Sequence, residues 1–147
     1  MEYTVKVKKL HEDAILPNIA KLGDAGADLF SVEETIIQPG QTVIVKTGIA
    51  IELPEGTEGQ VRPTSGNALK TGTIITNSPG TVDEGYRGEV GVIMRNLGNE
   101  NLTILKGKKI AQLCVRPVPK VTFIEVDTLS DSQRGNTGYG STGTMNK

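Results

Sequence analysis

Glycine and proline divide this chain into many short segments that are rich in valine, isoleucine and threonine. The sequence holds 18 glycines and 7 prolines in 147 residues. β-Branched residues favour strands, and closely spaced glycine and proline favour the turns between them. Helical structure is expected for at most about one turn, at residues 15–21 or 67–71. Strands are predicted at residues 3–10, 36–38, 42–53, 73–77, 90–95, 102–105, 109–118 and 121–126. This number of strands predicts an all-β fold, either a double-sheet jelly roll or a Greek-key distorted β-barrel.

The apolar pattern stops at Leu129, although the length of the chain fits one domain. We therefore predict a folded β domain at residues 1–128 and a flexible C-terminal arm at residues 129–147. The arm holds an arginine, a tyrosine, several hydroxyls and four glycines at close spacing. A disordered tail without a role is one interpretation. The other is a segment that wraps a phosphate, because arginine, hydroxyls and glycine backbone N–H groups are what such a segment needs.

Charge and rare residues exclude several classes of function. The formal net charge is −1 and the isoelectric point is near 5.9, which gives no basis for binding nucleic acid or an anionic membrane. A single cysteine, Cys114, excludes an internal disulfide framework and a cysteine-clustered metal site. A single histidine, His11, argues against a histidine zinc site or a Ser-His-Asp triad. The apolar runs are strand-sized and the N-terminus lacks a signal-peptide pattern, so a cytoplasmic protein is expected.

Residues 80–89 form a turn dense with glycine and charge between two apolar, β-branched runs. A surface hairpin with solvated charges is one interpretation, and a platform for a small ligand is the other. Asp83 is the best general-base candidate, because a carboxylate in a recessed turn can accept a proton from water. Tyr86 can place its ring against a sugar, and the amide of Asn77 suits the hydrogen-bonding edge of a pyrimidine. The chain offers no convincing activated nucleophile, which favours direct attack by water.

Three further positions carry weaker signals. Ser65 and Gly66 supply a hydroxyl and backbone amides that can approach an anion, although a structural turn is the commoner use of such a pair. Asp28 can hold the hydration shell of Mg²⁺, which keeps waters and prefers few carboxylates plus phosphate oxygens. Gln112 can donate its amide N–H to a phosphate or satisfy a strand edge.

Taken together, these stretches resemble the dUTPase family of trimeric deoxyuridine triphosphate hydrolases. Five motifs follow the order and spacing of the family, and they run from residue 25 to residue 143. They are Ala25-Gly26-Ala27-Asp28-Leu29, Arg62-Pro63-Thr64-Ser65-Gly66-Asn67-Ala68-Leu69-Lys70, Gly80-Thr81-Val82-Asp83-Glu84-Gly85-Tyr86-Arg87-Gly88-Glu89, Lys109-Ile110-Ala111-Gln112-Leu113 and Arg134-Gly135-Asn136-Thr137-Gly138-Tyr139-Gly140-Ser141-Thr142-Gly143.

The resemblance implies hydrolysis of dUTP to dUMP and pyrophosphate with Mg²⁺, which limits uracil incorporation into DNA and supplies dUMP for dTMP synthesis. It implies that Asp83 orients the water that attacks the α-phosphorus and that Asp28 acts on Mg²⁺ through water. It also implies a homotrimer whose sites combine three subunits, with the arm of one closing a site built by the others. The substrate-binding residues that it implies are Arg62, Ser65, Gly66, Asn77, Gly80, Val82, Tyr86, Gln112, Arg134, Tyr139, Gly140, Ser141 and Thr142.

Three positions depart from the family pattern. Thr64 stands where the family normally has arginine, so one positive charge is missing beside the phosphates, with Arg62 and Lys70 nearby in the sequence. Gly85 replaces a second acid and makes the turn more flexible. Asn67 replaces a residue that is commonly apolar.

The alternatives are a related enzyme on the same fold, a regulatory binder and a structural β-protein. The related enzyme is a dCTP deaminase or bifunctional deaminase–hydrolase, which would need a further acid–base constellation. The binder would use the same scaffold to engage a protein partner.

Overall fold

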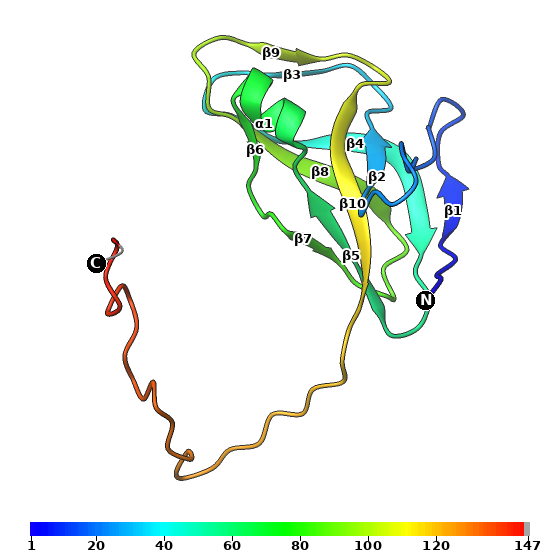
Figure 1. Cartoon of the computed structure of the whole chain (residues 1–147). Coiled ribbons are helices and arrows are strands. Elements are labelled where there is room, and N and C mark those ends of the chain that lie inside the picture. Colours follow the sequence, from blue (N-terminus) through cyan, green and yellow to red (C-terminus); the bar gives the residue numbers. More distant parts are fainter. Residues whose placement is uncertain (146–147) are drawn as a thin grey trace.

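The computed structural model describes residues 1–145 and confirms the all-β class (Figure 1). Two four-stranded sheets have the strand orders β1-β4-β8-β6 and β2-β10-β5-β7, and a two-stranded sheet pairs β3 with β9. This is the double-sheet arrangement of a jelly roll. The elements are β1 (Lys6–Lys9), β2 (Ala27–Phe30), β3 (Thr35–Ile37), β4 (Thr42–Glu52), β5 (Thr57–Arg62), α1 (Ser65–Thr71), β6 (Thr73–Ile75), β7 (Gly80–Val82), β8 (Glu89–Asn96), β9 (Leu102–Ile104) and β10 (Lys109–Pro117).

The hydrophobic core lies between the two larger sheets, because each contributes alternate side chains to it. In β5 the residues alternate between buried and half-buried over the whole strand, as expected for a strand with one face on the core. Apolar side chains of β2, β5, β7 and β10 pack with those of β4 and β8 in one buried cluster. Burial of this apolar area is the dominant favourable contribution to folding.

The stretch around residues 80–89 is more than the turn of a hairpin. β6 and β8 do pair antiparallel, with Ile75 opposite Met94, as the apolar runs on either side predicted. The chain between them, however, crosses to the other sheet and forms β7, which pairs with β5 through Gly80 opposite Val61. The catalytic candidate Asp83 therefore follows a strand whose paired residues lie 19 to 23 positions earlier in the sequence. Such a pairing leaves no local signal in the sequence.

Of the two helical turns expected from the sequence, one is confirmed and the other is wrong. The helical turn expected at residues 67–71 is α1, which begins at Ser65 and is capped by the Thr64 side chain. Residues 15–21 form no helix; Asn18 instead makes two backbone hydrogen bonds to Asp28, so this segment lies along β2. Among residues 1–145, no helix is long and apolar enough to span a membrane.

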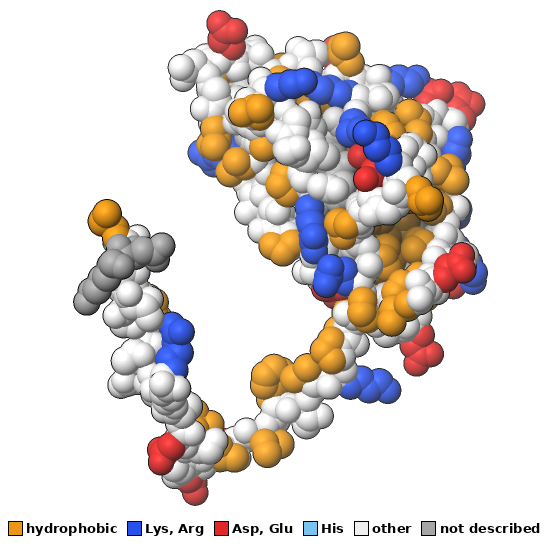
Figure 2. Space-filling model, viewed as in Figure 1, with side chains coloured by type: hydrophobic (Ala, Val, Ile, Leu, Met, Phe, Trp, Pro, Cys, Tyr) orange, Lys and Arg blue, Asp and Glu red, His pale blue; other side chains and the backbone are white. Residues whose placement is uncertain are grey.

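Residues 118–145 leave the body after β10 and form an arm that curves away from both large sheets (Figure 1). No strand forms at residues 121–126, so that prediction is wrong for the single chain. Among the described residues, no strand pairs with this backbone. The side chain of Phe123 is 92% exposed. Figure 2 shows hydrophobic side chains along the part of the arm nearest the body. The domain boundary at residues 128 and 129 stays a prediction.

Asn96, which is 1% exposed, ties the end of β8 to β3. Its Nδ2 donates to the carbonyls of Ile37 (2.9 Å) and Glu100 (2.7 Å), and its Oδ1 accepts from the backbone N–H of Gly98 (2.8 Å). Asn96→Ala is expected to lower the free energy of unfolding by about 2–4 kcal/mol, because buried groups lose their partners.

Chemical denaturation at equal protein concentration measures this effect, with Asn99→Ala at an exposed position as the control. The control is expected to change the free energy of unfolding by less than about 0.5 kcal/mol. Equal shifts in the two variants would contradict the role of Asn96.

Candidate functional site

A cavity of about 700 Å³ lies between α1, the start of β10 and the segment before β2; we call it the α1 cavity. Its walls bring together side chains from three of the five motifs, which are distant in the sequence. The register of the sheet explains this, because Gln112 of β10 lies opposite both Asp28 of β2 and Arg62 of β5. The lining residues are Ala20, Asp24, Ala25, Gly26, Asp28, Thr64, Ser65, Gly66, Asn67, Lys70, Thr71, Lys108, Lys109 and Gln112.

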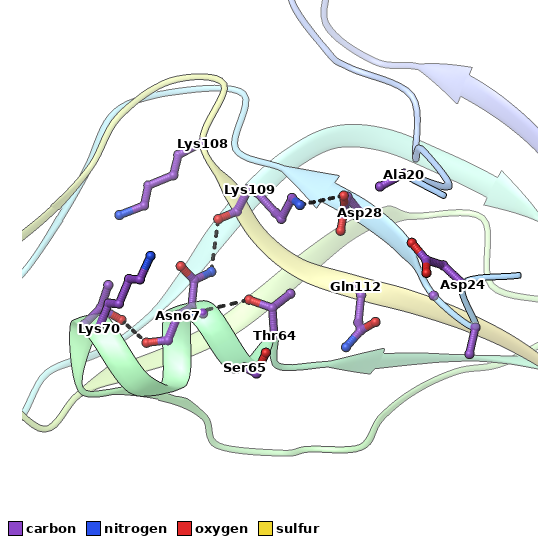
Figure 3. A pocket seen from close by; sticks show the side chains of 14 residues that line it. Ala20, Asp24, Asp28, Thr64, Ser65, Asn67, Lys70, Lys108, Lys109 and Gln112 are labelled. Atoms are coloured by element: carbon purple, nitrogen blue, oxygen red, sulfur yellow. Dashed lines mark hydrogen bonds and ion pairs between the residues drawn. The ribbon is translucent and has the colours of Figure 1, made fainter. Parts of the chain in front are cut away.

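Charged and amide groups fix one wall of the α1 cavity (Figure 3). Lys109 Nζ lies 2.8 Å from Asp28 Oδ2, and the Asp28 side chain is only 13% exposed. Asn67 Nδ2 donates to the Lys109 carbonyl (3.0 Å), which ties α1 to β10. Asn67, one of the departures from the family pattern, thus has a structural role that an apolar residue could not fill.

Gln112 is packed against Gly26, and its position depends on that glycine. A Cβ at residue 26 would lie 2.3 Å from Gln112 Oε1 and 3.1 Å from Gln112 Cβ. Gln112 Nε2 donates to the carbonyl of Pro63 (2.9 Å), directly before the motif that holds Ser65 and Gly66. Gly26 therefore allows the amide of Gln112 to lie in the cavity beside the Ser65 motif.

A second cavity, of about 280 Å³, lies beside β7; we call it the β7 cavity. Its lining residues are Ile44, Asn77, Thr81, Val82, Asp83, Tyr86, Glu89, Val90, Gly91 and Ile93. The ring of Tyr86 lies over Gly88, where a Cβ would be 2.6 Å from Tyr86 Cζ. Tyr86 Oη donates to the carbonyl of Glu89 (2.9 Å), which fixes the position of the ring at the cavity. An amide, an aromatic ring and apolar side chains form the kind of surface that recognises a base and a sugar.

Asp83 lies at the rim of the β7 cavity and is exposed. The Tyr86 N–H donates to the Asp83 carbonyl (3.0 Å), which closes the turn after β7. The sequence predicted a carboxylate in a recessed turn, and in the single chain it is not recessed. Another surface would have to cover this rim to exclude water from the carboxylate.

The predicted site residues therefore fall into separate groups. Asp28, Ser65, Gly66 and Gln112 line the α1 cavity, and Asn77, Val82, Asp83 and Tyr86 line the β7 cavity. The two cavities share no lining residue. Two predicted residues lie outside both: the Arg62 guanidinium donates to the Gln60 side chain, and Gly80 is buried in β7.

The predicted arm residues are not brought to either cavity. Arg134 Nε donates to the Thr137 carbonyl (3.1 Å) within the arm itself. Tyr139 is fully exposed, and the arm as a whole curves away from the body (Figure 1). The remaining arm residues that were predicted to bind substrate are Gly140, Ser141 and Thr142, and all of them are exposed.

The α1 cavity fits a magnesium ion that is held mainly by phosphate oxygens and water. In the part of the chain that the structure describes, no group of three or more His, Cys, Asp or Glu side chains could cage a metal. Asp24 and Asp28 nevertheless offer carboxylates at the cavity wall. Mg²⁺ keeps several waters and is commonly bound through one or two carboxylates plus substrate phosphates.

None of the three lysines of the α1 cavity, Lys70, Lys108 and Lys109, was predicted as a site residue. The sequence carried a signal for Lys108 and Lys109, which form a basic cluster with Lys106 at the start of the fourth motif. Figure 2 shows basic side chains gathered beside α1 and the start of β10. The three lysines and two aspartates that line the cavity leave it with one net positive charge.

Comparison with known proteins gives consistent matches over nearly the whole chain. The dUTPase family model matches residues 12–143. A deoxyuridine 5′-triphosphate nucleotidohydrolase of Clostridium tetani is 56% identical, over 97% of this chain and 98% of its own length. One of the same name from Clostridioides difficile is 55% identical, over 96% of this chain and 99% of its own length.

Solved structures agree with these matches. The Staphylococcus bacteriophage 80alpha dUTPase with dUpNHpp has a TM-score of 0.90 at 30% identity, covering 96% of this chain and 99% of that chain. A mutant dUTPase from phage phi11 of S. aureus, in which the coordination of a structural Mg(II) ion is described, has a TM-score of 0.79 at 28% identity. It covers 85% of this chain and 97% of that chain.

Proposed function

The chain belongs to the dUTPase family, and we propose that it hydrolyses dUTP to dUMP and pyrophosphate with Mg²⁺. The observation that carries the proposal is the pair of cavities with complementary chemistry. The α1 cavity offers a hydroxyl, amides and cations, which suit phosphates, and the β7 cavity offers an amide and an aromatic ring, which suit a nucleoside. No third cavity is needed to accommodate a nucleoside triphosphate.

The base and sugar would bind in the β7 cavity. Asn77 has a donor and acceptors on one amide, which match the hydrogen-bonding edge of uracil. Tyr86 would pack under the deoxyribose and leave no room for a ribose 2′-hydroxyl. Its ring is held by the hydrogen bond to the Glu89 carbonyl, so it presents a rigid wall. The backbone of residues 80–83, with Gly80 and Val82, would complete the recognition of the base.

Asp83 would activate the water for hydrolysis. Its carboxylate accepts a proton as the water oxygen bonds to the α-phosphorus. The bond between the α-phosphorus and the bridging oxygen breaks, and pyrophosphate leaves with the electron pair. Ser65 and Gly66 would contact this bridging region, and Gln112 would bind the α-phosphate. Mg²⁺ would neutralise phosphate charge, and phosphoryl transfer depends mainly on such neutralisation and on alignment.

The site would be completed in a homotrimer. In the single chain the two cavities share no residue, Asp83 is exposed at a rim and the arm reaches neither cavity. A neighbouring subunit that places its β7 cavity beside the α1 cavity would cover Asp83 and exclude water. The arm of a third subunit would then hold the β- and γ-phosphates with Arg134, Ser141 and Thr142 and stack Tyr139 on the uracil. The exposed apolar side chains of the arm, such as Phe123, are consistent with burial against another chain.

Pyrophosphate release from dUTP, dCTP, dTTP and UTP tests the proposal. The kcat/KM for dUTP is expected to exceed that for dCTP and UTP by at least about 100-fold, because the wrong base or sugar leaves polar groups unpaired or clashes. Equal or faster release from dCTP would favour the deaminase–hydrolase alternative. Absence of release from all four nucleotides would favour the regulatory binder.

A further inference from the structure

Two lysines of the α1 cavity carry charges that the proposed roles do not use. Lys109 is neutralised by Asp28 at 2.8 Å. Lys70 and Lys108 line the same cavity and take part in no ion pair within residues 1–145. Unpaired ammonium groups on the wall of a cavity attract anions, and two of them in one cavity favour a ligand with more than one negative charge.

We propose that Lys70 and Lys108 bind the β- and γ-phosphates of dUTP, the part that leaves as pyrophosphate. The inference rests on the proposed function and adds two binding residues to it. It also explains how the phosphate charge can be neutralised although Thr64 stands where the family has arginine. Thr64 is neutral, and its hydroxyl accepts from the Asn67 N–H.

Arg62 does not replace the missing charge. Its Nε donates to Gln60 Oε1 (3.0 Å), and a second bond joins Nη2 to the same oxygen. Arg62 also lies outside the residues that line the α1 cavity. Among the cations that line the α1 cavity, Lys70 and Lys108 are therefore the ones free to meet the distal phosphates, in addition to the Arg134 that an arm would bring.

The backbones that carry the two lysines are fixed relative to each other. Lys108 is held by Ser31, whose N–H donates to the Lys108 carbonyl (2.9 Å) and whose Oγ accepts from the Lys108 N–H (3.2 Å). Lys70 lies in the last turn of α1, and Asn67 ties this helix to β10 directly after Lys108. Long side chains on two fixed backbones can follow a phosphate group while they stay within reach of it.

The arrangement along the cavity fits the order of the phosphates. Figure 3 shows Lys70 and Lys108 at one end and Ser65 and Gln112 towards the other. With the α-phosphate at Gln112, the β- and γ-phosphates extend towards the lysines. The two ammonium groups would bind the substrate and neutralise the charge on the leaving pyrophosphate.

The test compares the full-length double variant Lys70→Gln/Lys108→Gln with wild type for dUTP hydrolysis and for inhibition by dUMP. The KM for dUTP is expected to rise about 30-fold, or about fivefold for each single variant, as exposed charge-assisted contacts typically contribute. The inhibition constant of dUMP is expected to stay within about twofold, because dUMP has no distal phosphates. The inhibition constant of inorganic pyrophosphate is expected to rise by about the same factor as the KM for dUTP.

Two controls separate this effect from charge and folding. Lys8→Gln/Lys9→Gln removes the same charge from exposed positions on β1 and is expected to leave the KM within about twofold. Lys70→Arg/Lys108→Arg keeps the charges and is expected to keep the KM within about threefold. If the double glutamine variant fails to fold, the single variants carry the same comparison.

Three outcomes would contradict either the role of the lysines or the proposed function. An unchanged KM for dUTP in folded variants would show that the lysines do not bind the substrate. An equal rise in the KM for dUTP and in the inhibition constant of dUMP would show that they do not act on the distal phosphates. Absence of dUTP hydrolysis by the wild-type protein would instead overturn the proposed function, and the role of the lysines would fall with it.

Discussion

Asp83→Asn is expected to bind dUTP with nearly wild-type affinity and to lose about 1,000-fold or more in kcat. The substitution keeps the size and shape of the side chain but removes the carboxylate that accepts the proton of the attacking water. General-base catalysis typically contributes about 100- to 10,000-fold, so most turnover depends on this one group. Steady-state pyrophosphate release gives kcat, and calorimetric titration with dUTP under conditions of slow turnover gives the affinity.

The neighbouring carboxylate provides a matched control. Glu84 follows Asp83 in the same exposed turn, and its Oε2 accepts from the Gly56 N–H (2.8 Å), on the side away from the β7 cavity. Glu84→Gln is expected to keep kcat within about threefold of wild type, because it retains a hydrogen-bond acceptor and touches no reacting atom. Undiminished turnover by Asp83→Asn, or equal losses in the two variants, would remove Asp83 from its proposed role.

The strands that the sequence predicted are those with a local signal. β4 and β8 are long runs of β-branched residues, and their apolar pattern alone identifies them. β2, β5 and β7 were not predicted. Ala27–Phe30 and Gly80–Val82 are short and lie in glycine-rich stretches, and Thr57–Arg62 (TEGQVR) contains a single β-branched apolar residue. These strands exist because distant partners in β10 and β5 pair with them, and tertiary context decides such segments.

For the site, the motifs predicted which residues are involved but not which of them the single chain places in each cavity. The resemblance implies a site built from several subunits, and the single chain places Ser65 and Gln112 in a different cavity from Asp83. Hydrophobic periodicity reports burial within one chain and carries no information on which surfaces meet in an assembly. For the same reason residues 121–126 have the composition of a strand and no partner in their own chain. Lys108, in contrast, lies in a basic stretch of the sequence, which is a local signal for an anion-binding position.

Deletion of residues 134–147 is expected to leave a folded protein of unchanged oligomeric size that hydrolyses dUTP about 100- to 1,000-fold less efficiently. Within residues 1–145, the side chain of Tyr139 is fully exposed and the side chain of Arg134 donates only to the arm, so the deletion removes no core contact. It does remove a guanidinium, two hydroxyls and an aromatic ring from the proposed site. Charge-assisted hydrogen bonds contribute about 1.5–3 kcal/mol each, so losing two accounts for most of the expected loss in kcat/KM. Light scattering, thermal unfolding and pyrophosphate release measure the three properties, with deletion of residues 144–147 as the control that keeps the motif.

Mixing two impaired variants tests whether the arm acts on another subunit. Each Asp83→Asn chain retains an intact arm, and each chain that ends at residue 133 retains Asp83. If a site takes its carboxylate and its arm from different subunits, random 1:1 trimers contain both parts in about a quarter of their sites, and that share of wild-type activity returns. If each arm closed over the Asp83 of its own chain, every site would carry one defect and refolding the variants together would restore nothing. Full activity of the chain that ends at residue 133, measured alone, would remove the arm from the site altogether.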